Sequence, residues 1–159
     1  MLPRSPPGGD GVDIPFTSTD IWLLLSIALA EDQPPVRLKD VLFVGDALHK
    51  AVFTPQELRR GLSKLTRASF VIDHEGTYSL TPQARIIVET ARAKSADWLS
   101  QGKQIERQLG ATRGPEDAPD YDDPRFPYPD LPDQAVREAT DQYRLEFASS
   151  LARLRQDRP

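Results

Sequence analysis

Apolar residues recur with the spacing of an α-helix in residues 54–68, and polar residues occupy the other sides of that helix. The apolar stripe consists of Leu58, Leu62 and Leu65. Thr54 can cap the first turn, Pro55 suits the first helical position, and Glu57 can complete a capping box. The pattern therefore predicts a helix from Pro55 to about Ala68.

The residues that follow have the pattern of a β-hairpin. Two short runs of β-prone residues, 70–72 and 77–80, flank a polar segment that contains Gly76. Thr81 and Pro82 then repeat the cap and the proline that begin the preceding helix. We expect a small hairpin followed directly by another helix.

Three elements are expected before the 55–68 helix. Residues 21–30 are apolar on several faces, which predicts a buried helix that ends at about Asp32, before two prolines. Thr17, Ser18 or Thr19 can cap that helix. Residues 36–38 can form a short strand beside the hairpin, and residues 41–50 a second helix that Gly45 can interrupt.

Residues 83–110 contain no proline and carry a heptad-like stripe of apolar and small residues, which predicts one long helix. The expected contacts of this helix with a second chain are Val88, Ala91, Trp98, Ile105 and Leu109. The pattern of residues 133–156 predicts a last amphipathic helix that packs against the long helix, in cis or in trans. Its apolar stripe comprises Val136, Ala139, Tyr143, Phe147, Leu151 and Leu154.

These elements predict a fold that is mainly α with a small β-hairpin. Its expected segments are a disordered tail over residues 1–16, a domain of helices and hairpin over 17–82, the long helix over 83–110, an acidic proline-rich linker over 111–132, and the last helix over 133–156.

Composition excludes several classes of chemistry. The 159 residues contain no cysteine, which excludes disulfides, thiol nucleophiles and cysteine zinc sites. The sequence shows no phosphate-binding loop and no Ser-His-Asp arrangement, so we expect no enzymatic activity and no cofactor. Asp46 and His49 have a spacing that could join two metal ligands, but no third ligand is near them in the sequence.

Membrane insertion and export are not expected. The apolar run 21–30 is too short to cross a hydrocarbon core of about 30 Å as a helix. Asp10, Asp13 and Asp20 precede or begin this run, whereas a secretory signal begins with positive charge. We therefore expect a cytoplasmic protein without membrane contact.

The net charge of −4 conceals a segregated distribution. Residues 33–70 carry seven basic and three acidic residues, whereas residues 111–132 carry two basic and six acidic residues. The basic segment includes the 55–68 helix, whose polar side chains could contact the phosphates and base edges of duplex DNA. These candidate DNA-binding residues are Gln56, Arg59, Arg60, Ser63, Lys64 and Arg67.

The order of the helices, the TPQELRRGLSKL helix, the FVIDHEGTYSLT hairpin and the TPQARIIVETA helix resembles winged-helix transcriptional regulators of the multiple-antibiotic-resistance and phenolic-acid-response types. The resemblance covers residues 17–109. It implies that the 55–68 helix enters the major groove of DNA, that the hairpin is a wing that touches the DNA, and that residues 84–109 help to form a homodimer.

One feature favours an alternative without DNA. The hairpin tip has Asp73, His74 and Glu75 where a phosphate-binding wing offers lysine or arginine. The alternative is a winged-helix protein-interaction module or adaptor that holds a protein partner through its long helices, its acidic linker and an aromatic strip within that linker. A further hypothesis is that the acidic linker folds over the basic helix and competes with nucleic acid.

Overall fold

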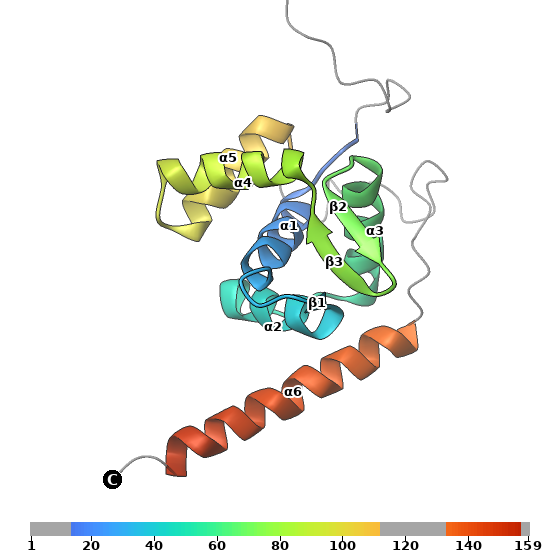
Figure 1. Cartoon of the computed structure of the whole chain (residues 1–159), viewed down its shortest axis with the longest axis vertical. Coiled ribbons are helices and arrows are strands. Elements are labelled where there is room, and N and C mark those ends of the chain that lie inside the picture. Colours follow the sequence, from blue (N-terminus) through green and yellow to red (C-terminus); the bar gives the residue numbers. More distant parts are fainter. Residues whose placement is uncertain (1–13, 112–132, 157–159) are drawn as a thin grey trace, which may run out of the picture.

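The computed structural model describes residues 14–111 and 133–156, and within them the chain is mainly helical with a small antiparallel sheet (Figure 1). The expected fold class is thereby confirmed. The elements are α1 (Ser18–Ala30), β1 (Val36–Arg37), α2 (Leu38–His49), α3 (Pro55–Arg67), β2 (Val71–His74), β3 (Thr77–Leu80), α4 (Pro82–Lys94), α5 (Trp98–Leu109) and α6 (Asp133–Gln156).

Helix α1 lies at the centre of the core and contacts α2, α3, α4, α5 and β3. Its start is fixed by a capping box in which the Thr17 hydroxyl accepts from the Asp20 amide and Asp20 accepts from the Thr17 amide. Most of its side chains are buried, as the apolar run predicts. Full burial of each leucine or isoleucine stabilises the fold by about 1.5–3 kcal/mol, so α1 dominates the apolar core.

The sheet has the order β1-β3-β2, with antiparallel pairing throughout. Strand β1 pairs Val36 with Tyr78 of the hairpin, which confirms the expected strand beside it. The hairpin reverses at Glu75 and Gly76, whose φ values of 53° and 89° are those of a tight two-residue turn. The Glu31 side chain at the end of α1 accepts from the Leu80 amide at 2.7 Å and so ties the sheet to the central helix.

Gly45 does not interrupt α2, contrary to one expectation. The helix runs from Leu38 to His49 without a break, and Gly45 is buried within it. A Cβ atom at this position would overlap the ring of Phe53. The Gly45 carbonyl also accepts a hydrogen bond of 3.0 Å from the indole N–H of Trp22. Glycine is therefore needed here because a ring and an indole approach the helix closely.

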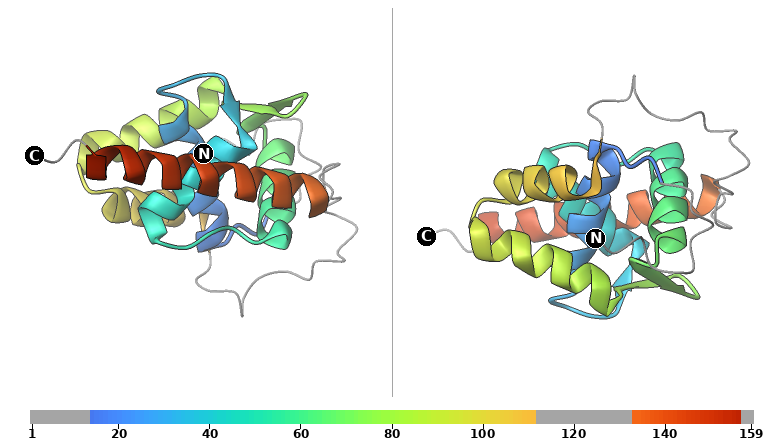
Figure 2. Two further views of the ribbon diagram at one scale, coloured as in Figure 1. Left: turned by 90° about the horizontal axis from the view of Figure 1, so that it is seen from below. Right: turned by 90° about the horizontal axis from the view of Figure 1, so that it is seen from above.

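The prediction of one long helix over residues 83–110 is wrong. Helix α4 ends at Lys94, and α5 begins at Trp98 and folds back beside α4 (Figures 1 and 2). Asp97 caps α5, since its carboxylate accepts from the amides of Leu99 and Ser100. The heptad-like stripe continues across this break, so periodicity alone missed a helix start that the cap specifies.

Helix α6 packs on a different surface from the one expected. It lies against α2, on the opposite side of the molecule from α4 and α5 (Figure 1). Val136 and Tyr143 are buried there, and the Tyr143 hydroxyl is 3.4 Å from a carboxylate oxygen of Asp46. Packing of this helix against the long helix within the same chain is therefore not found, whereas packing in trans stays a prediction. The bounds of α6 agree with the prediction. None of the helices in the described ranges has both the length and the apolar character needed to cross a membrane.

The predicted disordered tail extends too far. Phe16 is buried and stacks on Phe70, with ring centroids 5.9 Å apart. The carbonyl of Pro15 accepts a hydrogen bond of 2.8 Å from Lys64. The ordered chain therefore begins before Thr17, because an aromatic ring gains more from burial in the core than from exposure. Residues 1–13 lie outside the described residues, as do residues 112–132, which make up all of the predicted acidic linker except Ala111.

Burial of Tyr78 gives the sheet a measurable pH dependence. Desolvation, with a smaller contribution from the Asp73 carboxylate, raises the pKa of Tyr78 to about 12. The folded state then keeps the Tyr78 hydroxyl proton at pH values where the unfolded chain has lost it. The contribution of buried, neutral Tyr78 to the free energy of unfolding is therefore complete below about pH 10 and is lost as the pH rises towards 12. We expect urea unfolding to show a larger loss of stability between pH 9 and pH 11.5 in the native chain than in Tyr78→Phe. Equal losses in the two proteins would contradict a raised pKa.

Candidate nucleic-acid interface

Helix α3 begins as the local sequence specifies. The Thr54 hydroxyl accepts from the Glu57 amide at 3.2 Å, and the Glu57 carboxylate accepts from the Thr54 amide at 2.8 Å. Pro55 occupies the first turn, where its missing N–H costs nothing. The helix ends at Arg67, and Ser69 then adopts a φ of 60° that turns the chain into β2. These signals confirm the predicted capping box.

The six candidate DNA-binding residues of α3 are not equally accessible. Gln56 and Arg67 are exposed, and Arg59 is half-buried. By contrast, only 4%, 3% and 0% of the residue surface is exposed to solvent at Arg60, Ser63 and Lys64. The prediction that these last three side chains lie on an open outer face is wrong. Helical spacing gives the direction of a side chain around α3, but it does not show what covers that side chain in the folded molecule.

Lys64 is part of the core because α1 faces it. Its ammonium lies 2.9 Å from a carboxylate oxygen of Asp20, and both side chains are fully buried. Gly61, one turn earlier, lets α1 approach, since a Cβ there would lie 2.6 Å from a methyl carbon of Leu23. Burial lowers the pKa of Lys64, and the nearby Asp20 opposes this effect. Lys64 therefore joins α3 to α1 and presents no charge to solvent.

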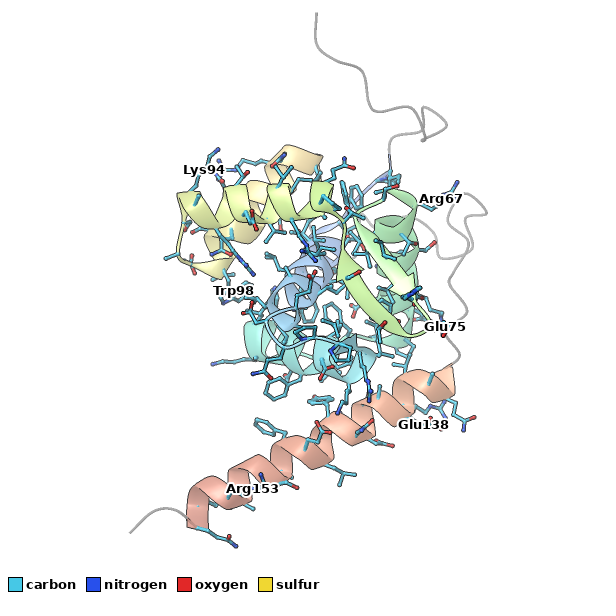
Figure 3. The ribbon with its side chains drawn as sticks, in the orientation of Figure 1. Arg67, Glu75, Lys94, Trp98, Glu138 and Arg153 are labelled. Carbon is cyan, nitrogen blue, oxygen red and sulfur yellow. The ribbon has the colours of Figure 1, made fainter. Side chains whose placement is uncertain are left out.

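The tip of the β2–β3 hairpin, the predicted wing, is exposed and acidic, as the sequence indicates. Asp73, His74, Glu75 and Gly76 are all exposed. Asp73 accepts a hydrogen bond of 3.1 Å from the Gly76 amide, so its carboxylate also shapes the turn. Figure 3 shows Glu75 at the tip of the hairpin and Arg67 at the far end of α3. The hairpin tip is therefore negatively charged, whereas the end of α3 at Arg67 is positively charged.

Helix α6 borders the wing. A cavity of about 460 Å³ separates its first turns from the tip of the hairpin and the start of α2, and it is lined by Glu75, Glu138 and Arg37 among others. On the same side, Lys39 forms an ion pair of 2.8 Å with Glu146 of α6. Helix α6 thus neutralises one basic residue of the predicted basic segment and brings further carboxylates close to the wing.

The expected dimer contacts are occupied within the chain. Val88, Ala91 and Ile105 are buried, while Trp98 and Leu109 are partly buried. Because α5 folds back beside α4 and onto α1, this stripe forms part of the internal core. The homodimer itself stays a prediction.

A second concave site was not identified from the sequence. Trp22, His49 and Trp98 lie close together, although they are far apart along the chain. From the sequence, His49 was interpreted only as a possible metal ligand together with Asp46. In the structure His49 lies between two indoles, and no group of three or more metal-ligating residues occurs in the described ranges. The pair of tryptophans was the available signal, but sequence does not show that they meet.

Comparisons with protein-family models, with curated proteins and with solved structures found no match for this chain. The function must therefore be inferred from the geometry described above.

Replacing Lys64 separates a structural role from a DNA-binding role. Lys64→Met leaves the Asp20 carboxylate buried without its ion pair, a change that typically destabilises a fold by about 3–5 kcal/mol. We expect a loss of this size in chemical unfolding. The matched control is Lys94→Met, at an exposed position of α4. Its free energy of unfolding should stay within about 0.5 kcal/mol of the native value. Equal effects of the two substitutions would contradict the core role of Lys64.

Proposed function

We propose that this chain is a DNA-binding winged-helix protein that regulates transcription in the cytoplasm, with α3 as the helix that meets duplex DNA. The single observation that carries the proposal is the order of elements, α1-β1-α2-α3-β2-β3, together with the sheet order β1-β3-β2. This order sets α3 beside a hairpin wing, and a helix so presented can enter a major groove.

The accessible residues of α3 supply the proposed contacts. Gln56, Arg59 and Arg67 lie on one side of the helix at steps that return to the same face. Arginine can form paired hydrogen bonds with guanine or bind a phosphate, and glutamine can pair with adenine. Lys64 is excluded from this role because it is paired with Asp20 in the core.

The acidic wing limits how DNA can approach. Asp73 and Glu75 at the exposed tip would repel phosphates, so α3 must provide most of the affinity. Arg59 and Arg67 are the two accessible arginines of α3, so one such helix offers few phosphate contacts. A homodimer would double them, which is why we propose that the regulator binds DNA as a dimer.

A protein-interaction module is the second candidate, and a specific observation favours it. Arg60 and Ser63 are buried in the middle of α3, between the accessible ends of that helix. Large apolar side chains are instead exposed on α2 and α6, where Phe43 and Phe147 lie with ring centroids 6.4 Å apart and Leu145 is 70% exposed. Such a surface suits a protein partner better than a polyanion.

The first test is fluorescence-anisotropy titration of the full chain with labelled mixed genomic duplexes at low and moderate salt, with the mass in solution measured in parallel. Binding that weakens steeply with salt is expected. The double variant Arg59→Ala/Arg67→Ala should bind at least tenfold more weakly. It should also reduce the slope of log K against log salt by about 2, since each phosphate contact contributes about 0.9.

The matched control removes two positive charges elsewhere. Lys94 and Arg107 are exposed on α4 and α5, so Lys94→Ala/Arg107→Ala changes the net charge equally. Its affinity should stay within about twofold of the native value. An equal loss in both double variants would contradict the assignment to α3. If the native chain does not bind DNA even at low salt, the protein-interaction module is favoured instead.

Neutralising the wing should have the opposite effect on affinity. Asp73→Asn/Glu75→Gln removes two negative charges and preserves an acceptor for the Gly76 amide. If the wing lies near phosphates, the same titration should show binding several-fold tighter than that of the native chain at low salt, and this gain should shrink at moderate salt. Weaker binding by this variant would contradict the proposed orientation.

A further inference from the structure

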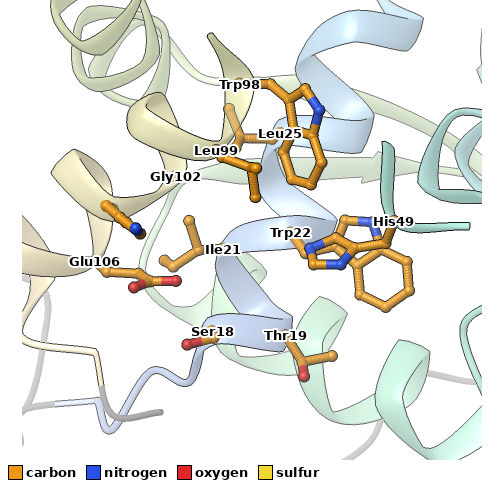
Figure 4. A pocket seen from close by; sticks show the side chains of 11 residues that line it. Ser18, Thr19, Ile21, Trp22, Leu25, His49, Trp98, Leu99, Gly102 and Glu106 are labelled. Carbon is orange, nitrogen blue, oxygen red and sulfur yellow. The ribbon is translucent and has the colours of Figure 1, made fainter. Parts of the chain in front are cut away.

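A cavity of about 350 Å³ lies between α1, α5 and the end of α2 (Figure 4). This volume is within the range of small-molecule sites in proteins. The aromatic wall of the cavity consists of Trp22, His49 and Trp98, and Figure 4 shows Glu106 of α5 across the cavity from His49. Lys103 also lines the cavity. The cavity thus has aromatic rings on one side and a carboxylate on the other.

The aromatic wall is held in a fixed arrangement. The Trp22 indole donates to the Gly45 carbonyl and stacks on Phe53 at a centroid distance of 3.7 Å. His49 lies 4.6 Å from Trp22 and 4.9 Å from Trp98, again between ring centroids. Because these rings support one another, the wall is present in the structure without a ligand, which lowers the ordering cost of binding.

The charged wall favours a cation. In the described part of the chain, the Glu106 carboxylate takes part in no ion pair or side-chain hydrogen bond given by the structure, and it is partly buried. Lys103 is exposed, so water screens its charge. Burial lowers the pKa of His49 although Glu106 opposes the shift, so the imidazole is neutral at pH 7 and adds no positive charge. A ligand cation between Glu106 and the aromatic wall would meet a carboxylate and electron-rich rings.

Gly102 keeps the cavity open. It is buried on the face of α5 that lines the cavity. A Cβ atom there would lie 3.6 Å from a methyl carbon of Leu25, which is an ordinary contact. Alanine therefore fits at this position, whereas a larger side chain would extend into the cavity.

We propose that this cavity is a binding site for a planar aromatic cation, such as a protonated nitrogen heterocycle. The aromatic wall would pack against the ring of this ligand, and Glu106 would pair with its charge. This site is independent of the proposed DNA contact, because none of its residues belongs to α3 or the wing.

The chain offers a direct readout for this proposal. It contains two tryptophans, and both line the cavity. A ¹⁵N–¹H correlation spectrum of the full chain should show two indole signals, which Trp98→Phe assigns. Titration with 4-aminoquinoline at pH 7, where it is protonated, should shift both signals with one saturation curve. Neutral 1-naphthol and anionic 1-naphthoate, which have the same two-ring size, should bind at least tenfold more weakly.

Two variants and two controls locate the site. Glu106→Gln should weaken 4-aminoquinoline binding at least tenfold, and Gly102→Leu should abolish it by filling the cavity. Asp141→Asn on exposed α6 and Gly102→Ala should each bind within about threefold of the native chain. If Gly102→Leu fails to fold, as dispersion of the same spectrum reveals, Glu106→Gln decides alone. Absence of saturable shifts, equal binding of the three probes, or unchanged binding by Glu106→Gln would overturn the proposal.

Discussion

Burial of α1 on nearly every side is the constraint on which the rest of this structure depends. A helix with so few exposed side chains must be covered by several elements, and α2, α3, α5 and the sheet all pack on it. The Asp20 carboxylate is buried by the same packing. It is tolerated because it caps α1 and because Lys64 of α3 neutralises it at 2.9 Å. The core therefore fixes both the position and the rotation of α3.

The burial of α1 reduces the number of basic residues on α3 that DNA could reach. A cationic residue on a predicted recognition helix is usually counted as available to DNA, but Lys64 serves the α1–α3 contact. The accessible positive charge of α3 is then limited to half-buried Arg59 and exposed Arg67. The exposed carboxylates at the hairpin tip would repel phosphates. The proposed regulator must therefore rely on few contacts per chain, and this is the physical basis for treating a protein partner as the second candidate.

The break between α4 and α5 has a second consequence. A continuous helix would project from the domain and leave α1 open on one side. Instead, the Asp97 cap starts a new helix that returns to α1 and places Trp98 beside His49. The fold thereby closes its core within one chain and at the same time forms the cavity with an aromatic wall and Glu106. The Asp97 cap sets the start of α5, and packing of α5 on α1 and α4 produces both features.

The sequence by itself determined the elements whose signals are local. The capping box at Thr54 and Glu57, the hairpin turn at Glu75 and Gly76, and the apolar run of α1 each specify their structure within a few residues. Only the tertiary structure decided which surfaces these elements share. It buried Lys64 against Asp20, placed α6 on α2, and brought Trp22 to Trp98 through His49. Periodicity reports the direction of a side chain around its own helix. Burial and pairing depend on which helix lies opposite, and this is set by packing of the whole core.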